Sequence, residues 1–203
     1  MDFNNLFINI FSSSFLILKR TLHLILTPYK TMREISLRGD KTESILLFLS
    51  SFLYLIVAGY LRKSVAMGII SCGAFILVFY VTAYFFYYIS HGFNQEIKKT
   101  PFFITFSYTL IPTFFWFITN IILFILLPPP RTMSILGQGF SIIFIAYSIS
   151  LLVWKLILVY FALRFSSKLG LYRIIYMMLL YLVIFVPLSL LLYYLKIFRI
   201  PFL

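Results

Sequence analysis

The sequence predicts an all-α, polytopic membrane protein with five transmembrane helices and an N-terminal amphipathic helix at the membrane interface. Three observations support this prediction. The chain is 63% hydrophobic and only 11% charged, about half the charged fraction of an ordinary soluble domain. Its apolar runs are long enough to cross a hydrocarbon core, which requires roughly 20 residues in a helix. These runs are continuously apolar, whereas the strands of a membrane β-barrel alternate between apolar and polar residues.

The N-terminal segment, residues 1–43, is expected to lie at the membrane surface. Polar side chains recur at steps of three, four or seven along residues 3–26, which places them on one stripe of a helix. Such a helix lies in the plane of the interface or packs on the protein's own spans, and the sequence leaves both open. Thr27 can cap a second short helix with Pro28 at its first position, which we expect at the lipid headgroups. The basic residues expected to contact the interface are Lys19, Arg20 and Arg33.

Five apolar runs form the predicted transmembrane domain. The spans are expected at residues 44–61, 65–90, 102–127, 139–165 and 174–195, followed by a short tail, residues 196–203. So few residues separate the first two spans that they must form an antiparallel hairpin. Gly68 and Gly73, with Ser71 and Ala74, on the second span are expected to form a close-packing face.

The third span carries a proline near its middle. Pro112 has no N–H and its ring clashes with the carbonyl one turn earlier, so we expect a kink there. The freed carbonyl needs a partner, which a hydroxyl such as Ser107 or Thr109, a neighbouring helix or water can supply. Pro187 lies in the same way within the fifth span.

Basic residues are distributed unequally between the two ends of the predicted spans. Of the 17 lysines and arginines, eleven fall on the side of the N-terminus, five on the other side, and Lys155 lies within the fourth span. Cytoplasmic loops carry the excess of Lys and Arg, so we expect a cytoplasmic N-terminus and an external C-terminus. The expected location is the cytoplasmic membrane, or the ER or Golgi membrane in a eukaryote. The same placement favours contact with lipid headgroups over nucleic-acid binding, despite a net charge of +12.

The sequence offers little for catalysis or metal binding. We expect all five acidic residues outside the spans, and His23, His91 and Cys72 are scattered, so no cluster has the spacing of a metal site. A glycine-rich phosphate loop is also missing. We therefore expect a non-enzymatic protein without a cofactor or metal. Its expected partners are the lipid bilayer and other membrane proteins.

Lys155 is the most unusual residue within the spans. It lies about 13 Å from the helix end at Arg164, at 1.5 Å per residue, which is too far for its side chain to reach the headgroups. Its ammonium should face protein or a hydrated cleft, with Asn120 or hydroxyls as partners. It is either tied to backbone carbonyls at a proline kink, part of a site for an anionic headgroup or partner, or one half of a serine-lysine dyad with Ser148 or Ser150. The candidate intramembrane site residues are Lys155, Asn120, Pro112, Tyr108 and Trp154.

Several segments together resemble the Yip (Ypt/Rab-interacting protein) domain family. They are the lead-in LTPYKTMREI, the segment YTLIP from Tyr108 to Pro112, and WKLILVYFALRFSSK, which begins at Trp154. The likeness covers roughly residues 24–195, and the short form looks like the prokaryotic branch. The resemblance implies a non-enzymatic integral membrane protein. Eukaryotic relatives bind prenylated Rab-type GTPases, and some bacterial relatives accompany ABC-type export systems.

Three functions are compatible with these features. The first is an accessory or scaffold subunit of a larger membrane transport or lipid-handling assembly, for example one with ABC transporter subunits. The second is a transporter or channel subunit with a path near Pro112, Asn120, Lys155 and Pro187. The third is a Yip-like trafficking factor that binds Rab-type GTPases or shapes membranes through its amphipathic N-terminus.

Overall fold

The structure is a computed structural model that describes residues 3–61, 65–126 and 135–195. Within these residues the regular secondary structure is helical throughout, without a strand. Five of the helical segments are long and apolar enough to cross a membrane. The predicted all-α, multi-pass membrane fold is therefore confirmed.

The five membrane-length segments coincide with the predicted spans. They are α3 (Lys41–Leu61), α4 (Val65–Phe93), the composite of α5 (Lys99–Ser107), the 3-10 helix η1 (Tyr108–Leu110) and α6 (Ile111–Leu126), α7 (Ile135–Ser167), and α8 (Leu171–Tyr194). Several begin earlier than expected, since a helix can continue beyond the hydrocarbon core into polar residues such as Lys41 and Lys99. Residue 127 and the predicted tail, residues 196–203, lie outside the described residues.

The third span breaks where its proline predicts. Pro112 would clash with the carbonyl of Tyr108 in a regular α-helix, and the chain turns into η1 at Tyr108. The Ile111 N–H donates to the Tyr108 carbonyl, so the tighter 3-10 turn satisfies the freed acceptor. The Thr109 hydroxyl donates to Phe106 O at 2.7 Å. By contrast, α8 continues without a break through Pro187.

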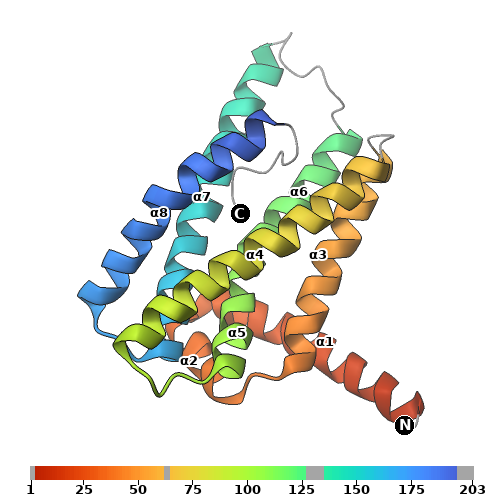
Figure 1. Cartoon of the computed structure of the whole chain (residues 1–203). Helices are drawn as coiled ribbons and strands as arrows, with labels where there is room; N and C mark the ends of the chain where they lie inside the picture. The colour runs from red at the N-terminus through yellow and green to blue at the C-terminus, as the bar shows by residue number, and fades with distance from the viewer. Residues whose placement is uncertain (1–2, 62–64, 127–134, 196–203) are drawn as a thin grey trace.

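The first two spans form a close hairpin, α3 against α4 (Figure 1). A Cβ placed on Gly68 would lie 3.1 Å from the Gly59 Cα and 3.2 Å from the Leu55 carbonyl oxygen. The absence of a side chain at Gly68 therefore lets the two backbones approach. Gly73 was expected on the same face, and that prediction is wrong: it is exposed, and nothing lies within 4 Å of a Cβ placed there.

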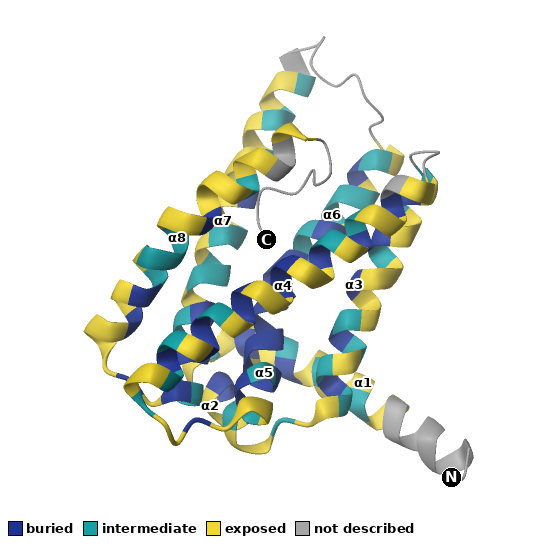
Figure 2. Ribbon diagram, in the orientation of Figure 1, coloured by how far each residue is buried: buried dark blue, intermediate teal, exposed yellow. Residues whose placement is uncertain are grey.

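Helices α1 (Phe3–Leu26) and α2 (Pro28–Arg38) lie across one end of the bundle (Figure 1). Pro28 takes the first position of α2, while the Thr27 hydroxyl donates back to His23 O at 3.2 Å and does not cap the helix. Met32 and Ile35 of α2 are buried in the core, so this helix packs on the spans (Figure 2).

Helix α1 combines the two placements that the sequence left open. Leu24 is fully buried against the protein, but Phe11 and Phe15 are 71% and 66% exposed. Exposed aromatic and aliphatic side chains on a helix at the end of the spans are typical of insertion into the lipid interface. One face of α1 therefore packs on protein and the other remains available to lipid.

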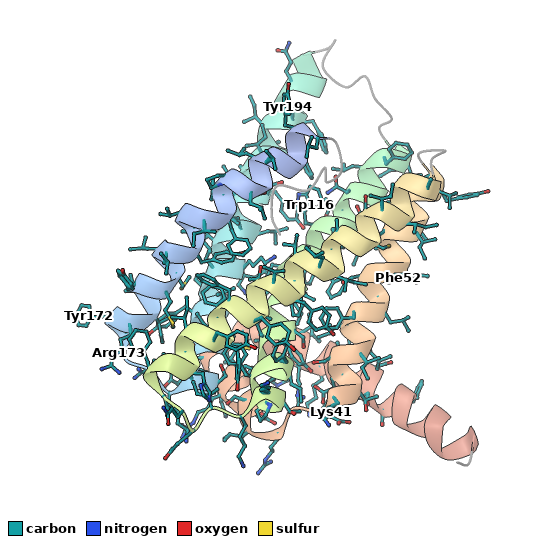
Figure 3. The ribbon with its side chains drawn as sticks, viewed as in Figure 1. Lys41, Phe52, Trp116, Tyr172, Arg173 and Tyr194 are labelled. Atoms are coloured by element: carbon teal, nitrogen blue, oxygen red, sulfur yellow. The ribbon has the colours of Figure 1, made fainter. Side chains whose placement is uncertain are left out.

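Exposed basic residues gather at one end of the bundle, among the residues that the structure describes. Lys41 and Arg173 lie toward the end that carries α1 and α2, and Tyr194, at the end of α8, lies at the opposite end (Figure 3). The eleven basic residues that the sequence assigned to the N-terminal side belong to the first of these ends, and all of them except Arg20 are exposed. Helix α1 and the C-terminal end of α8 thus lie at opposite ends of the bundle, as an odd number of crossings requires.

Candidate functional site

A cavity lies between α4, α5, η1, α7 and α8, inside the membrane-length part of the fold. Its volume is about 430 Å³, and we call it the intramembrane cavity. It is lined by Val78, Phe79, Thr82, Phe86, Phe106, Thr109, Leu110, Leu152, Lys155, Leu156, Val159, Met178, Tyr181, Leu182, Phe185, Val186, Ser189 and Leu190. Cavities of roughly 300 to 1,000 Å³ with apolar walls and a few polar groups are the usual sites of small-molecule ligands.

The aromatic wall of the cavity is fixed by contacts between α4 and α8. The Thr82 and Tyr181 hydroxyl oxygens lie 3.1 Å apart, within hydrogen-bonding distance. The Tyr181 ring lies 4.9 Å from that of Phe86 and stacks on Phe185 at 4.3 Å, between ring centroids. These contacts join the middle of α8 to α4.

The cavity reaches the lipid-facing surface of the protein. Val186 and Leu190 line it and are nevertheless 50% and 65% exposed. Both lie toward the end of α8, beyond the aromatic contacts. A molecule in the bilayer can therefore approach the cavity from the side, along α8.

Among the described residues that line the cavity, Lys155 is the only basic one. It is partly buried on α7, and its Nζ donates to the Thr113 hydroxyl oxygen at 3.1 Å. Thr113 follows Pro112, and both line a second, small hollow together with Lys155. The lysine thus lies between the intramembrane cavity and the proline break of the third span, with a hydroxyl partner of the kind the sequence suggested.

The other predicted intramembrane residues do not join Lys155 in one site. Asn120 donates to Trp116 O on its own helix at 2.8 Å and lines a separate hollow beside Tyr54. Trp154 packs on Phe115, with 5.7 Å between ring centroids. Pro187 is exposed on α8. The structure therefore brings Lys155 and Pro112 together but gives Asn120 and Pro187 other surroundings.

The two serines considered as partners of Lys155 have other hydrogen bonds. Ser148 accepts a bond from Trp116 Nε1 at 3.1 Å and donates to Phe144 O at 2.8 Å. Ser150 is exposed and donates to Ala146 O at 3.0 Å. Among the described residues, no group of three or more His, Cys, Asp or Glu could hold a metal ion.

A second polar cluster lies at the end of the bundle near α1 and was not predicted as a unit. The Arg20 guanidinium forms a salt bridge with the Glu43 carboxylate, which also accepts a hydrogen bond from the Tyr108 hydroxyl. Arg20 is 7% exposed, Glu43 1% and Tyr108 0%. Arg20 was expected at the interface and Glu43 outside the spans; instead the two charges compensate each other inside the protein, with Glu43 in the first turn of α3.

The charge state of Arg20 follows from its surroundings. Burial acts to lower the pKa of its guanidinium, but the contacts with Tyr108 and the Glu43 carboxylate outweigh burial and raise that pKa above its usual value. Arg20 therefore stays protonated in the folded protein. One sequence signal could have found the cluster: Glu43 is the only acidic residue directly before an apolar run, where an unpaired carboxylate would be costly.

The remaining predicted interfacial residues lie on the surface. Lys19 and Arg33 are exposed, at the same end of the bundle as the other basic side chains. Exposed residues of this kind near the helix ends can contact anionic headgroups. The exposed basic residues at this end of the bundle are Lys19, Lys30, Arg33, Arg38, Lys41, Lys98, Lys99, Arg164, Lys168 and Arg173.

Comparison with known proteins returned no family model, curated protein or solved structure that matches the chain significantly. The resemblance to the Yip domain family therefore stays a prediction from the segments quoted above.

Proposed function

We propose that this protein is a non-enzymatic, integral membrane accessory subunit that holds a lipid-like amphiphile for a larger transport or lipid-handling assembly. The observation that carries the proposal is the intramembrane cavity. Its walls are apolar, its volume suits a small molecule, and exposed lining residues connect it to the bilayer.

The bilayer itself explains why such a cavity would be occupied. Lipid tails are as apolar as the side chains of the spans, so hydrophobicity gives no driving force for α8 to close on α7. An apolar cavity open to lipid can therefore accept a tail from the membrane. Converging polar side chains such as Lys155 and Thr109 distinguish it from a plain crevice between helices, because they can orient a polar head.

In the proposed orientation the N-terminus is cytoplasmic, in the cytoplasmic membrane. The exposed basic residues at the α1 and α2 end support this orientation through the positive-inside rule. Transport through a path that includes Asn120 and Pro187 has less support, since neither residue lines the cavity.

The test is photolabelling of the purified full chain in nanodiscs with a diazirine-bearing analogue of hexadecanol. We expect label on residues 178–190 of α8. Val186→Trp places a large side chain in the cavity and should reduce this label several-fold. Val183→Trp is the matched control, because Val183 is 72% exposed and does not line the cavity. Equal labelling of the two variants would contradict the proposal.

The accessory role is tested separately, by purification from its own membrane in mild detergent followed by mass spectrometry. The role predicts a membrane protein partner that copurifies reproducibly. A chain that is always recovered alone would leave ligand binding intact and remove the accessory role.

A further inference from the structure

We propose that the intramembrane cavity binds its ligand most tightly while α1 is docked on α3, and that Tyr108 couples the docking contact to the cavity. This inference rests on the proposed function, namely that the cavity holds a lipid-like molecule, and adds how ligand binding there is regulated. Coupling between two sites is reciprocal. A ligand in the cavity should therefore also hold α1 in its docked position.

A buried ion pair docks α1 on α3. The Arg20 guanidinium of α1 pairs with the carboxylate of Glu43, in the first turn of α3, and also donates to the Arg38 carbonyl oxygen at 3.5 Å. Both charged side chains are buried, and a buried charge that loses its partner is costly. The docked position of α1 is therefore defined by this pair.

Tyr108 connects the ion pair to the break in the third span. Its hydroxyl donates to the Glu43 carboxylate, and the Arg20 guanidinium donates to the hydroxyl oxygen at 3.4 Å. Tyr108 is fully buried and is the first residue of η1. Next to it, the hydroxyl oxygens of Ser44 and Ser107 lie 2.7 Å apart, within hydrogen-bonding distance. The beginning of α3 and the beginning of η1 are thus held together.

The neighbours of Tyr108 in the chain line the intramembrane cavity. Thr109 and Leu110 follow it in η1, and Phe106 precedes it by two residues. Tyr108 is not among the described lining residues, and its hydroxyl is bonded to the ion pair instead. Because these residues share one helical turn, a shift of the Tyr108 backbone also shifts this wall of the cavity.

The third span has a hinge at the same place. A 3-10 stretch within a longer helix often marks a functional hinge, and η1 lies between the helices α5 and α6. Pro112 prevents the regular α-helical hydrogen bond to the Tyr108 carbonyl, so the local chain alone does not fix the geometry. Contacts with neighbouring helices must therefore set it, and the bond from Tyr108 to Glu43 is one of these contacts.

The element of this network that can move most easily is α1. It projects past α3 (Figure 1), and Phe11 and Phe15 on its outer face are largely exposed. Of its residues with a described exposure, residues 11–26, only Arg20 and Leu24 are buried. Segments with few buried contacts open at a lower free energy than the core. Helix α1 can therefore leave α3 while the spans stay packed.

The experiment measures how often α1 leaves α3, with and without saturating hexadecanol, in the full chain in phosphatidylcholine nanodiscs. Leu24→Cys, combined with Cys72→Ala, carries one thiol at a fully buried position of α1, so a charged maleimide reacts with it mainly when α1 undocks. A ligand that binds the docked state makes this opening rarer by the coupling factor, typically about 5-fold to 150-fold. We expect hexadecanol to slow the reaction about fivefold or more.

Two cavity variants control for an effect of hexadecanol on the bilayer itself. Val186→Trp fills the cavity, so hexadecanol should no longer slow the reaction of the thiol on α1. Val183→Trp lies outside the lining and should keep the effect. Slowing of equal size in both variants would show that the alcohol acts through the bilayer, and the coupling would be refuted.

Tyr108→Phe separates coupling from docking. It keeps the ion pair between Arg20 and Glu43, so α1 still docks, but it removes the hydroxyl that connects η1 to Glu43. Hexadecanol should still label α8 in this variant, while its effect on the thiol reaction should disappear. Tyr147→Phe is the matched control, because it removes a hydroxyl that lies 2.9 Å from that of Thr119, away from η1, and should keep the effect.

A second variant decides the question if Tyr108→Phe does not fold. Arg20→Met combined with Glu43→Met removes both charges that Tyr108 contacts, so it should abolish the effect of hexadecanol on the thiol reaction as well. Lys19→Met, at the exposed neighbour of Arg20, should keep that effect.

The outcomes separate this inference from the proposed function. If hexadecanol labels α8 but leaves the rate of the thiol reaction unchanged in the otherwise wild-type chain, only this inference fails. If the effect persists both in Tyr108→Phe and in the double methionine variant, Tyr108 does not couple α1 to the cavity. If the label does not reach α8 at all, the proposed function fails as well.

Discussion

The buried cluster of Arg20, Glu43 and Tyr108 should respond to mutation as a unit. Arg20→Met leaves the Glu43 carboxylate buried without its cation, and removal of one partner of a buried ion pair costs about 3 to 5 kcal/mol. Glu43→Met leaves the guanidinium unpaired and should cost about as much. The double variant removes both charges, so it should unfold at nearly the same free energy as the wild type.

The double-mutant cycle gives the coupling between these residues. If each single variant costs about 3 to 5 kcal/mol and the double variant about zero, the coupling free energy is roughly 6 to 10 kcal/mol. Tyr108→Phe removes one donor to the carboxylate and should cost about 1 to 3 kcal/mol.

Reversible unfolding in mixed micelles with increasing SDS provides the assay. Trp116 and Trp154 serve as fluorescent probes of the third and fourth spans. Lys19→Met is the matched control, because Lys19 is the exposed neighbour of Arg20 and its replacement should change stability by less than about 0.5 kcal/mol. The reasoning is refuted if Arg20→Met behaves like Lys19→Met, or if the double variant is as unstable as the sum of the two single variants.

Two further predictions concern helix packing and orientation. Gly68→Leu should destabilise the protein by about 1 to 3 kcal/mol in the same unfolding assay, because the leucine side chain meets the Gly59 backbone. Gly73→Leu should leave the stability unchanged, because nothing lies near a Cβ at that position. Equal effects of the two substitutions would mean that the close approach of α3 and α4 does not matter for stability. Green fluorescent protein fused to the N-terminus should fluoresce, as a cytoplasmic end requires, and alkaline phosphatase fused to the C-terminus should be active, as an external end requires. Reporter signals that place both chain ends on one side of the membrane would rule out the proposed topology.

Local features of the sequence predicted much of the fold. The spans follow from apolar runs matched to the thickness of the hydrocarbon core, and the break at η1 follows from Pro112, since a proline disturbs the carbonyl four residues before it. Gly73 shows the limit of this reasoning. Its position on a span is clear from the sequence, but the face that it presents to a neighbour depends on how α4 is rotated.

The candidate site was only partly predictable. Lys155 can be identified as a candidate from the sequence alone, because a charged lysine side chain within an apolar span is energetically costly however the helix packs. Its partner is Thr113 and not Asn120, although both are polar residues of the third span. Thr113 and Asn120 are seven residues apart on α6, so they share nearly the same face of the helix and differ in depth along it. The sequence does not specify which level of α6 lies beside Lys155 of α7.

The sequence by itself determined that the chain crosses a membrane five times, where its third span bends, and that one cation lies at membrane depth. Each of these depends on residues close together in the chain. Only the tertiary structure decided that Arg20 pairs with Glu43 and that α8 leaves a cavity beside Lys155. Both depend on how separate helices pack, and the bilayer, which is as apolar as their surfaces, imposes no particular packing through hydrophobicity.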